Sequence, residues 1–488
     1  MSGPTRILHS QKLCSPLLLA LVVGWISCLF FLLPGKGMLP AGVASVTSFF
    51  LAQALLPRSR MTLAPLVTPL NWLQFAFFIQ LIVMPVTVRI WGFAQSEFLR
   101  SPPTVLADNV ALLLITLAYW SFCAAVHFRN KPSEQKPADS SALQWPLPTF
   151  YICFCVALGI VGLAGRFKSF TVFSHYLTDP GVYELEVDRQ GASATLFDAA
   201  GDLLSTSLGL SMVMVWCRSL DRGLHGSGIS KVTGPVLLIV AMLAFAISMG
   251  YNRGAFVYPS IALLGVISIR APRQTARYFL IVTSAMVFLV TSTVIYRTSS
   301  HIEDIGSVPS WDVVTQRVDI MEYFQDYGQA PQYLAVMLDE SHYGLEPRLG
   351  RLSAVSILTQ IPKLTKALVP LNGHSYYSAL TGHAEENAPF IGEVFLDFNF
   401  MGVIVAFWLV GYATAILQQK VLNATDAFEV YVFQIMGVYL FASVLLSVDV
   451  LGLFFVFSMF PLYIYFAARP LLRKIGEQKG VTQFQKHA

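Results

Sequence analysis

Long apolar runs separated by short polar connections dominate the chain. A helix needs about 17 to 25 apolar residues to cross the hydrocarbon core of a bilayer, and twelve runs have about this length. They lie at approximately 16–33, 38–56, 70–94, 105–127, 147–164, 197–217, 233–249, 255–269, 278–295, 389–417, 429–447 and 449–467. The pattern therefore predicts an all-α polytopic membrane protein with about 12 transmembrane helices.

Two longer polar stretches interrupt this alternation, near 165–196 and at about 296–388. A connection as long as the second is usually functional or disordered. Within it, residues 309–328 place apolar side chains at helical spacing, and residues 352–370 form an apolar stretch with two lysines that could lie along a membrane surface. We therefore expect a large, partly helical loop that caps the membrane domain.

The same pattern suggests four parts along the chain. Residues 1–295 hold the first nine predicted transmembrane helices, and residues 296–388 form the cap. Residues 389–467 hold the last three predicted helices, and residues 468–488 form a polar tail.

Composition agrees with a membrane location, because only 12% of the residues are charged and 55% are hydrophobic, against about 25% charged in soluble domains. Most loop arginines and lysines fall on the side of the N-terminus, so the positive-inside rule predicts cytoplasmic termini and a cap outside. The net charge of +4 is spread over these loops and does not indicate nucleic-acid binding. The chain has no Walker loop, no dinucleotide fingerprint and no cysteine spacing typical of metal ligands. We therefore expect neither a cofactor nor a metal.

Arginines gather in the predicted outer connections. Arg253 lies in the turn between the seventh and eighth runs, Arg297 follows the ninth, and Arg317, Arg348 and Arg351 lie in the cap. A guanidinium group presents a planar fork that matches phosphate oxygens. If the fold brings them together, these residues would form a pyrophosphate clamp; taken singly, each could be an ordinary surface residue.

A second group of polar residues lies around the start of the tenth run: His374, His383, Glu393 and Asp397. Glu393 and Asp397 are four residues apart and so share one helix face. Carboxylates at membrane depth are costly and usually mark a functional cavity, although these two could instead cap or hydrogen-bond the loop. His374 or Glu393 could act as a general base, and we assign His383 and Asp397 to substrate binding.

The outward Asn252-Arg253-Gly254, the long outer loop with arginine and histidine, and the segment PFIGEVFLDFNFMG at 389–402 resemble the Wzy-type polymerases of oligosaccharide repeat units. The resemblance is best over about 245–415. Some members carry an arginine followed after ten residues by a glycine, a spacing similar to that of Arg317 and Gly328. His374 lies too far before Gly392 to match the histidine and glycine spacing of the related O-antigen ligases.

The resemblance implies a GT-C-like glycosyltransferase of the bacterial inner membrane, active at the periplasmic face without metal or nucleotide. Its substrate would be an undecaprenyl-pyrophosphate-linked oligosaccharide, and its partners the lipid bilayer, a chain-length regulator and a flippase. An acceptor hydroxyl, aided by His374 or Glu393, would displace the lipid pyrophosphate with inversion. The product could be O-antigen, capsule or exopolysaccharide.

Two other functions fit the same residues. One is an O-antigen ligase-type transferase, and the other is a lipid-linked oligosaccharide flippase or ion-coupled transporter. Transporters usually place ionisable groups and broken helices at the membrane midplane. Here the arginines, histidines and acids are concentrated in the outer segments instead, so the sequence favours surface chemistry.

Overall fold

The computed structural model is helical throughout the part of the chain that it describes, and no strand occurs there. The described residues are 41–55, 67–92, 103–129, 149–167, 172–173, 196–224, 233–249, 254–271, 275–300, 324–325, 328, 331–340, 348–359, 361, 368–381, 388–424 and 426–467. All-helical architecture, as the apolar patterning predicted, is confirmed for these ranges.

Helices occupy eleven of the twelve predicted ranges, and the first range, 16–33, lies outside the described residues. The elements of the apolar part are α3 (Ala41–Leu55), α5 (Pro69–Phe78), η1 (Ile79–Val83), α6 (Met84–Trp91), α7 (Val105–Arg129), α8 (Thr149–Phe167), α11 (Leu196–Leu224), α12 (Thr233–Met249), α13 (Gly254–Arg270), α14 (Thr275–Ser300), α21 (Phe390–Asn423), α22 (Ala427–Leu445), α23 (Asp449–Leu453) and η4 (Phe454–Ser458). Those of the predicted cap are α17 (Pro331–Glu340), α18 (Arg351–Leu358), η3 (Val369–Leu371) and α20 (Gly373–Thr381).

Six helices in the described ranges are long and apolar enough to cross a membrane. They are Pro69–Trp91, Val105–Arg129, Thr149–Phe167, Leu203–Asp221, Phe390–Asn423 and Ala427–Leu445. A seventh span results if Asp449–Val456 and Phe460–Ala467, which meet at 46°, are taken as one broken helix. Three further apolar helices are shorter, so the count of twelve spans stays a prediction.

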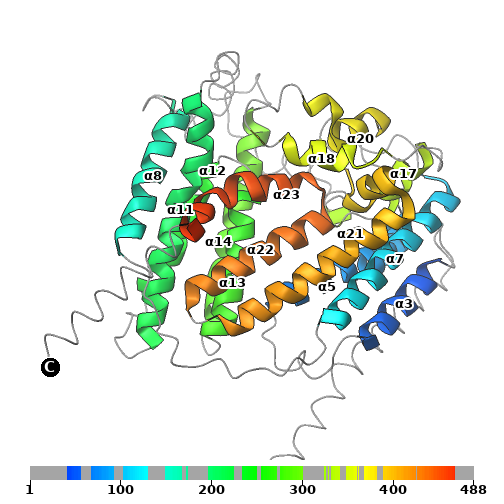
Figure 1. The fold of residues 1–488 in the computed structure, drawn as a ribbon, viewed down its shortest axis with the longest axis horizontal. Coiled ribbons are helices and arrows are strands. Elements are labelled where there is room, and N and C mark those ends of the chain that lie inside the picture. The colour runs from blue at the N-terminus through cyan, green and yellow to red at the C-terminus, as the bar shows by residue number, and fades with distance from the viewer. Residues whose placement is uncertain are drawn as a thin grey trace, which may run out of the picture.

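The long helices form two groups that lie side by side (Figure 1). In one, α21 packs between α7 and α22, and α13 packs on the other side of α22. In the other, α11 packs along α8 and α12, and it reaches the first group through contacts with α22 and η4. The cap helices α17, α18 and α20 gather at one end of the first group, where α18 contacts α23 and α17 contacts α7.

Glycines allow the closest helix pairs to form. A Cβ atom on Gly159 of α8 would lie 2.6 Å from the backbone nitrogen of Leu208 on α11, and one on Gly411 of α21 would lie 2.5 Å from the carbonyl oxygen of Phe122 on α7. Neither backbone could move away without separating the helices. Small residues at such crossings let two backbones approach closely, which is how apolar helices gain packing energy inside a lipid environment.

The span Pro69–Trp91 contains a π-helical turn, η1, immediately before Pro85. Proline has no N–H to donate, and its ring conflicts with the carbonyl four residues earlier. A wider turn before it accommodates both effects, as π-bulges in helices commonly do. The turn also directs Gln80 inward, where its Nε2 donates to the carbonyl oxygen of Val444 at 3.3 Å.

Candidate functional site

The candidate site is built around a break in α21. Asn399 has φ 57° and ψ −159° inside this helix, a region of backbone space that is otherwise used almost only by glycine and that costs about 1–3 kcal/mol. The backbone N–H groups of Arg348 and Leu349 donate to the carbonyl oxygens of Leu396 and Asp397, at 3.1 and 2.9 Å. The last carbonyls before a helix end need such donors, so the segment 348–350 docks on the break.

Asp397 connects this break to the cap. Its carboxylate accepts hydrogen bonds from the backbone nitrogens of Leu352 and Ser353, at 3.0 and 2.8 Å, and from the Ser353 hydroxyl at 2.7 Å. These donors belong to the first turn of α18, whose own N-cap residue, Gly350, has no side chain to offer. Asp397 is completely buried and therefore acts as the N-cap of a helix about 45 residues away in sequence.

Glu393 lies one turn earlier on α21 and is also completely buried. Its carboxyl group rests against the backbone of Gly373, the first residue of α20, where no Cβ would fit. The Gly373 N–H donates to the Ser356 hydroxyl of α18 at 3.0 Å. That hydroxyl lies beside the carboxyl groups of Glu393 and Asp449. Both oxygens of Glu393 and Oδ1 of Asp449 nevertheless have no well-formed hydrogen bond to the described part of the chain.

His374 completes this cluster, and its side chain is only partly buried. It interacts electrostatically with Asp449 at the start of α23, whose carboxyl group in turn interacts with that of Glu393. Asp449 of α23 therefore interacts with both His374 of α20 and Glu393 of α21, and Ser356 of α18 lies beside the two acids. We refer to His374, Ser356, Glu393 and Asp449 as the acid–histidine cluster.

Two further contacts fix the orientation of α20. The guanidinium carbon of Arg348 lies 4.0 Å from the centre of the Tyr376 ring, a cation–π distance. The Tyr377 hydroxyl donates to the carbonyl oxygen of Tyr333 on α17 at 3.0 Å. Asn372 caps the helix, because its Oδ1 accepts from the Ser375 backbone nitrogen at 2.7 Å. The helix that carries His374 is thus capped by Asn372 and held by contacts with Arg348 and Tyr333.

The structure brings together four of the nine residues predicted from sequence: His374, Glu393, Asp397 and Arg348. Arg351 is the first residue of α18 and is exposed. The others cannot be placed in the site: Arg297 lies on α14 where side chains are not described, and Arg253, Arg317 and His383 lie outside the described residues. Their predicted roles stay predictions.

The sequence analysis did not assign Asp449 or Ser356 to the site. Asp449 carried a usable signal, because it is an acid within the otherwise apolar residues 448–457. Ser356 carried none, since a serine on an amphipathic stretch is ordinary.

Metal ligation has no support in the described ranges, where no group of three or more His, Cys, Asp or Glu residues could hold a metal ion.

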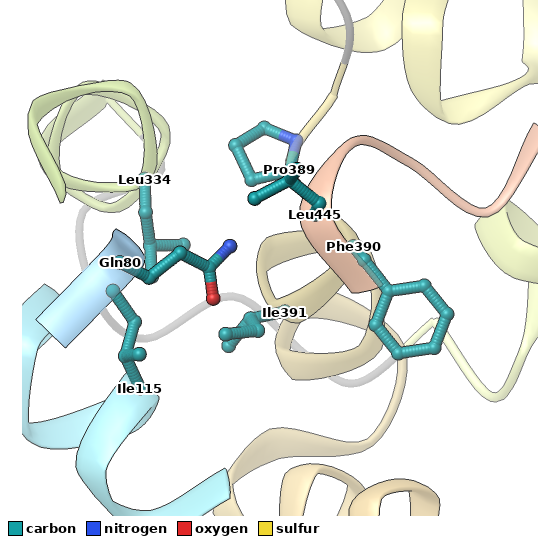
Figure 2. A pocket seen from close by; sticks show the side chains of 7 residues that line it. All are labelled: Gln80, Ile115, Leu334, Pro389, Phe390, Ile391 and Leu445. Atoms are coloured by element: carbon teal, nitrogen blue, oxygen red, sulfur yellow. The ribbon is translucent and has the colours of Figure 1, made fainter. Parts of the chain in front are cut away.

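A small cavity lies close to the site, at the junction of η1, α7, α17, α21 and α22 (Figure 2). It is lined by Gln80, Ile115, Leu334, Pro389, Phe390, Ile391 and Leu445. Its volume is about 10 Å³, which is the size of about one water molecule. Figure 2 shows the Gln80 amide turned into this space, and its Oε1 has no hydrogen bond to a described residue. This cavity is too small for a sugar or a lipid.

In the described ranges the fold is all-helical, and several of its helices are apolar, as is typical of a membrane protein. No protein-family model, curated protein or solved structure matches it.

Proposed function

We propose that this protein is a membrane glycosyltransferase that polymerises undecaprenyl-pyrophosphate-linked oligosaccharide units, as the resemblance to Wzy-type polymerases implies. The observation that supports it most is the acid–histidine cluster. It combines a partly exposed histidine with buried carboxyl groups, and Arg348 stacks on Tyr376 of the same helix as His374. Arg351 is exposed at the start of α18, and its backbone N–H donates to the Arg348 carbonyl oxygen. These are the groups that a glycosyl transfer from a lipid pyrophosphate requires: a base for the acceptor and positive charge for the leaving group.

In this proposal the twelve apolar runs span the inner membrane of a bacterium, with both termini in the cytoplasm. The cap helices then lie at the periplasmic face, over the end of the bundle that holds the cluster (Figure 1). The positive-inside distribution of loop arginines and lysines supports this orientation. A donor that enters from the outer leaflet would reach His374 without crossing the helix bundle.

The chemical step follows from these positions. An acceptor sugar hydroxyl loses its proton to His374 while its oxygen attacks the anomeric carbon of the donor. The bond from that carbon to the pyrophosphate oxygen breaks, and the electron pair leaves with the lipid pyrophosphate. Arg348 and Arg351 stabilise the departing charge, and single displacement inverts the anomeric centre. Because Glu393 is completely buried, we assign it, with Asp449, to holding His374 and α20 in position.

A lipid-linked oligosaccharide transporter is the second candidate, since the break at Asn399 and the bent pair after Asp449 are features that transporters share. Alternating access needs a cavity that opens to both sides. The cavity at the start of α21 holds only about one water molecule and offers no such passage. An O-antigen ligase would use the same chemistry with lipid A as the acceptor.

The test is turnover by the purified full-length chain in lipid nanodiscs, given undecaprenyl-pyrophosphate-linked repeat units from its host and no nucleotide. A polymerase yields a ladder of longer lipid-linked chains, which His374→Ala abolishes. The matched control is Asp339→Asn, since Asp339 lies on the cap but bonds Thr104 at 3.0 and 3.1 Å instead of the cluster. Transfer only to added lipid A, or only movement across the bilayer, would overturn the polymerase in favour of a ligase or a transporter.

A further inference from the structure

One face of α21 is apolar and exposed from the break onward. Met401, Val405 and Leu409 are each more than half exposed, with Met401 at 67%, and they follow one another at four-residue spacing. Trp408 and Tyr412 widen the same face. We call these five residues the α21 row; at 1.5 Å per residue it is about 16 Å long.

An exposed apolar face by itself indicates only contact with bilayer lipid. Helix α14 has a comparable face that includes Leu280 and Phe288. The α21 row differs from the face of α14 at its N-terminal end, next to the break at Asn399. There Leu349 is 81% exposed and has φ 53°, a conformation that is rare for a large side chain. The hydrogen bond from its N–H to the Asp397 carbonyl holds it in this position. A strained leucine held in an exposed position is costly unless an apolar partner covers it.

The apolar residues at this end surround the break itself. Phe398 and Phe400 flank Asn399 and are both exposed. A Cβ on Gly350 would lie 2.8 Å from the Phe398 ring, so the segment 348–350 packs directly on it. Leu349, Phe398 and Phe400 therefore place further exposed apolar side chains between the α21 row and the cap, with the exposed Asn399 between the two phenylalanines.

Positive charge lies directly beside this apolar end. Arg351 is exposed at the start of α18, and Arg348 precedes Leu349 and is only partly buried against Tyr376. The buried carboxyl group of Asp397 is engaged by three hydrogen-bond donors of α18 and does not face the surface. Two guanidinium groups at the head of an apolar row complement a ligand that has a multiply charged phosphate head and a long hydrocarbon tail.

We propose that Arg348, Arg351, Leu349 and the α21 row form the seat of a polyprenyl pyrophosphate, with its phosphates on the two arginines and its isoprenoid chain along α21. The inference rests on the proposed function for the choice of this lipid. It adds where the carrier lies: on the outer surface of α21, across the break from the acid–histidine cluster. The break then separates the tail from the sugar, which extends over Asp397 toward His374.

The experiment is site-specific photo-crosslinking without turnover. The photoreactive residue p-benzoylphenylalanine is placed at Met401, and at Leu280 as the control, since the exposure of the two side chains is nearly equal at 67 and 68%. The full-length chain is reconstituted in phosphatidylglycerol nanodiscs with a small fraction of undecaprenyl pyrophosphate, and adducts are identified by mass. We expect polyprenyl adducts at Met401 and phosphatidylglycerol adducts at Leu280. Arg348→Gln with Arg351→Gln should lower the polyprenyl adduct at Met401 by about tenfold or more, the effect of losing one charge-assisted contact.

Three results would contradict this proposed binding site. Equal polyprenyl yields at Met401 and Leu280 would make the α21 row an ordinary lipid-facing surface, and adducts to a second copy of the chain would make it a subunit interface. An undiminished yield in a folded arginine variant would show that the arginines do not hold the head; Arg351→Gln alone serves if the double variant does not fold. Because no turnover is needed, adducts at Met401 without polymer would refute only the proposed function, and polymer without adducts would refute only the seat.

Discussion

The role of Asp397 offers the sharpest test of how the site is built, because the sequence suggested substrate binding and the structure shows a helix cap. Asp397→Ala removes the acceptor for three donors of the first turn of α18. Losing an N-cap acceptor costs about 0.5–2 kcal/mol, and leaving a buried N–H such as that of Leu352 without a partner costs about 1–3 kcal/mol. We expect a loss of about 2–4 kcal/mol in the free energy of unfolding.

A graded series makes this estimate specific. Asp397→Asn keeps one acceptor oxygen and the shape of the side chain, so about half of the loss should remain. Ser353→Ala removes only the hydroxyl donor at 2.7 Å and should cost at most about 1 kcal/mol. The unfolding temperature should decrease least in Ser353→Ala, more in Asp397→Asn and most in Asp397→Ala. The decrease in Asp397→Ala should be a few degrees, since 1 kcal/mol moves the midpoint by about 2–4 °C even in chains of 150–250 residues.

The assay is thermal unfolding of the detergent-solubilised chain, followed by intrinsic fluorescence, together with hydrogen exchange of peptides covering α18. Exchange in α18 should rise in Asp397→Ala and stay unchanged in α8, which lies in the other helix group. An Asp397→Ala protein with an unchanged midpoint and unchanged exchange, but weakened binding of the lipid-linked substrate, would refute the cap and restore the substrate-binding role.

Two further predictions concern other residues. Gly373→Ala should lower the unfolding temperature, because the new Cβ collides with the buried Glu393 carboxyl group. In a chain that already carries Glu393→Ala, the same substitution should lower it no further. Equal decreases with and without Glu393→Ala would contradict the contact. Asp426 lies between α21 and α22, and burial raises its pKa from 3.8 to about 6. The folded chain therefore binds the carboxyl proton more tightly than the unfolded chain does. The free energy of unfolding should fall as pH rises from about 4 to 6. At 1.36 kcal/mol per pKa unit, the charge costs at most about 3 kcal/mol at pH 7. Asp426→Asn keeps an oxygen that can accept from the Glu429 backbone nitrogen. This variant should be more stable than the wild-type chain at pH 7 but not at pH 4. Thermal unfolding between pH 4 and 8 measures the difference, and a difference that does not change with pH would contradict the prediction.

Sequence patterning predicted the helices well because the length of an apolar run depends only on local composition. The bounds of α7 and α22 differ from the predicted 105–127 and 429–447 by two residues or fewer at each end. The predicted helix at 309–328 falls almost wholly outside the described residues. In the apolar stretch 352–370, which could lie along a membrane surface, α18 covers the first part and ends at Leu358, and η3 begins at Val369.

The site was harder to predict, because its contacts join segments that are distant in sequence. The four-residue spacing of Glu393 and Asp397 correctly indicated a shared helix region, and both are buried there. Spacing could not show that Asp397 points to α18 and Glu393 to α20, because those partners are set by how the cap folds back. Nor could it show the break, since asparagine at position 399 reads as an ordinary polar residue in an apolar run.

The break at Asn399 divides α21 into a part that is buried beneath the cap and a part with an exposed apolar face. Every residue from Phe390 to Asp397 is buried, and the next four residues are all exposed. This change in burial coincides with the kink at Asn399, before which Glu393 and Asp397 are buried and after which an apolar face is exposed. The strained backbone at Asn399 changes the direction of the helix between the two halves, and the cap supplies hydrogen bonds to the carbonyls freed there. Under the proposed function, the lipid-linked substrate would therefore place its polar head on the cap side of Asn399 and its apolar tail on the exposed side, so both proposals depend on the geometry of this one residue.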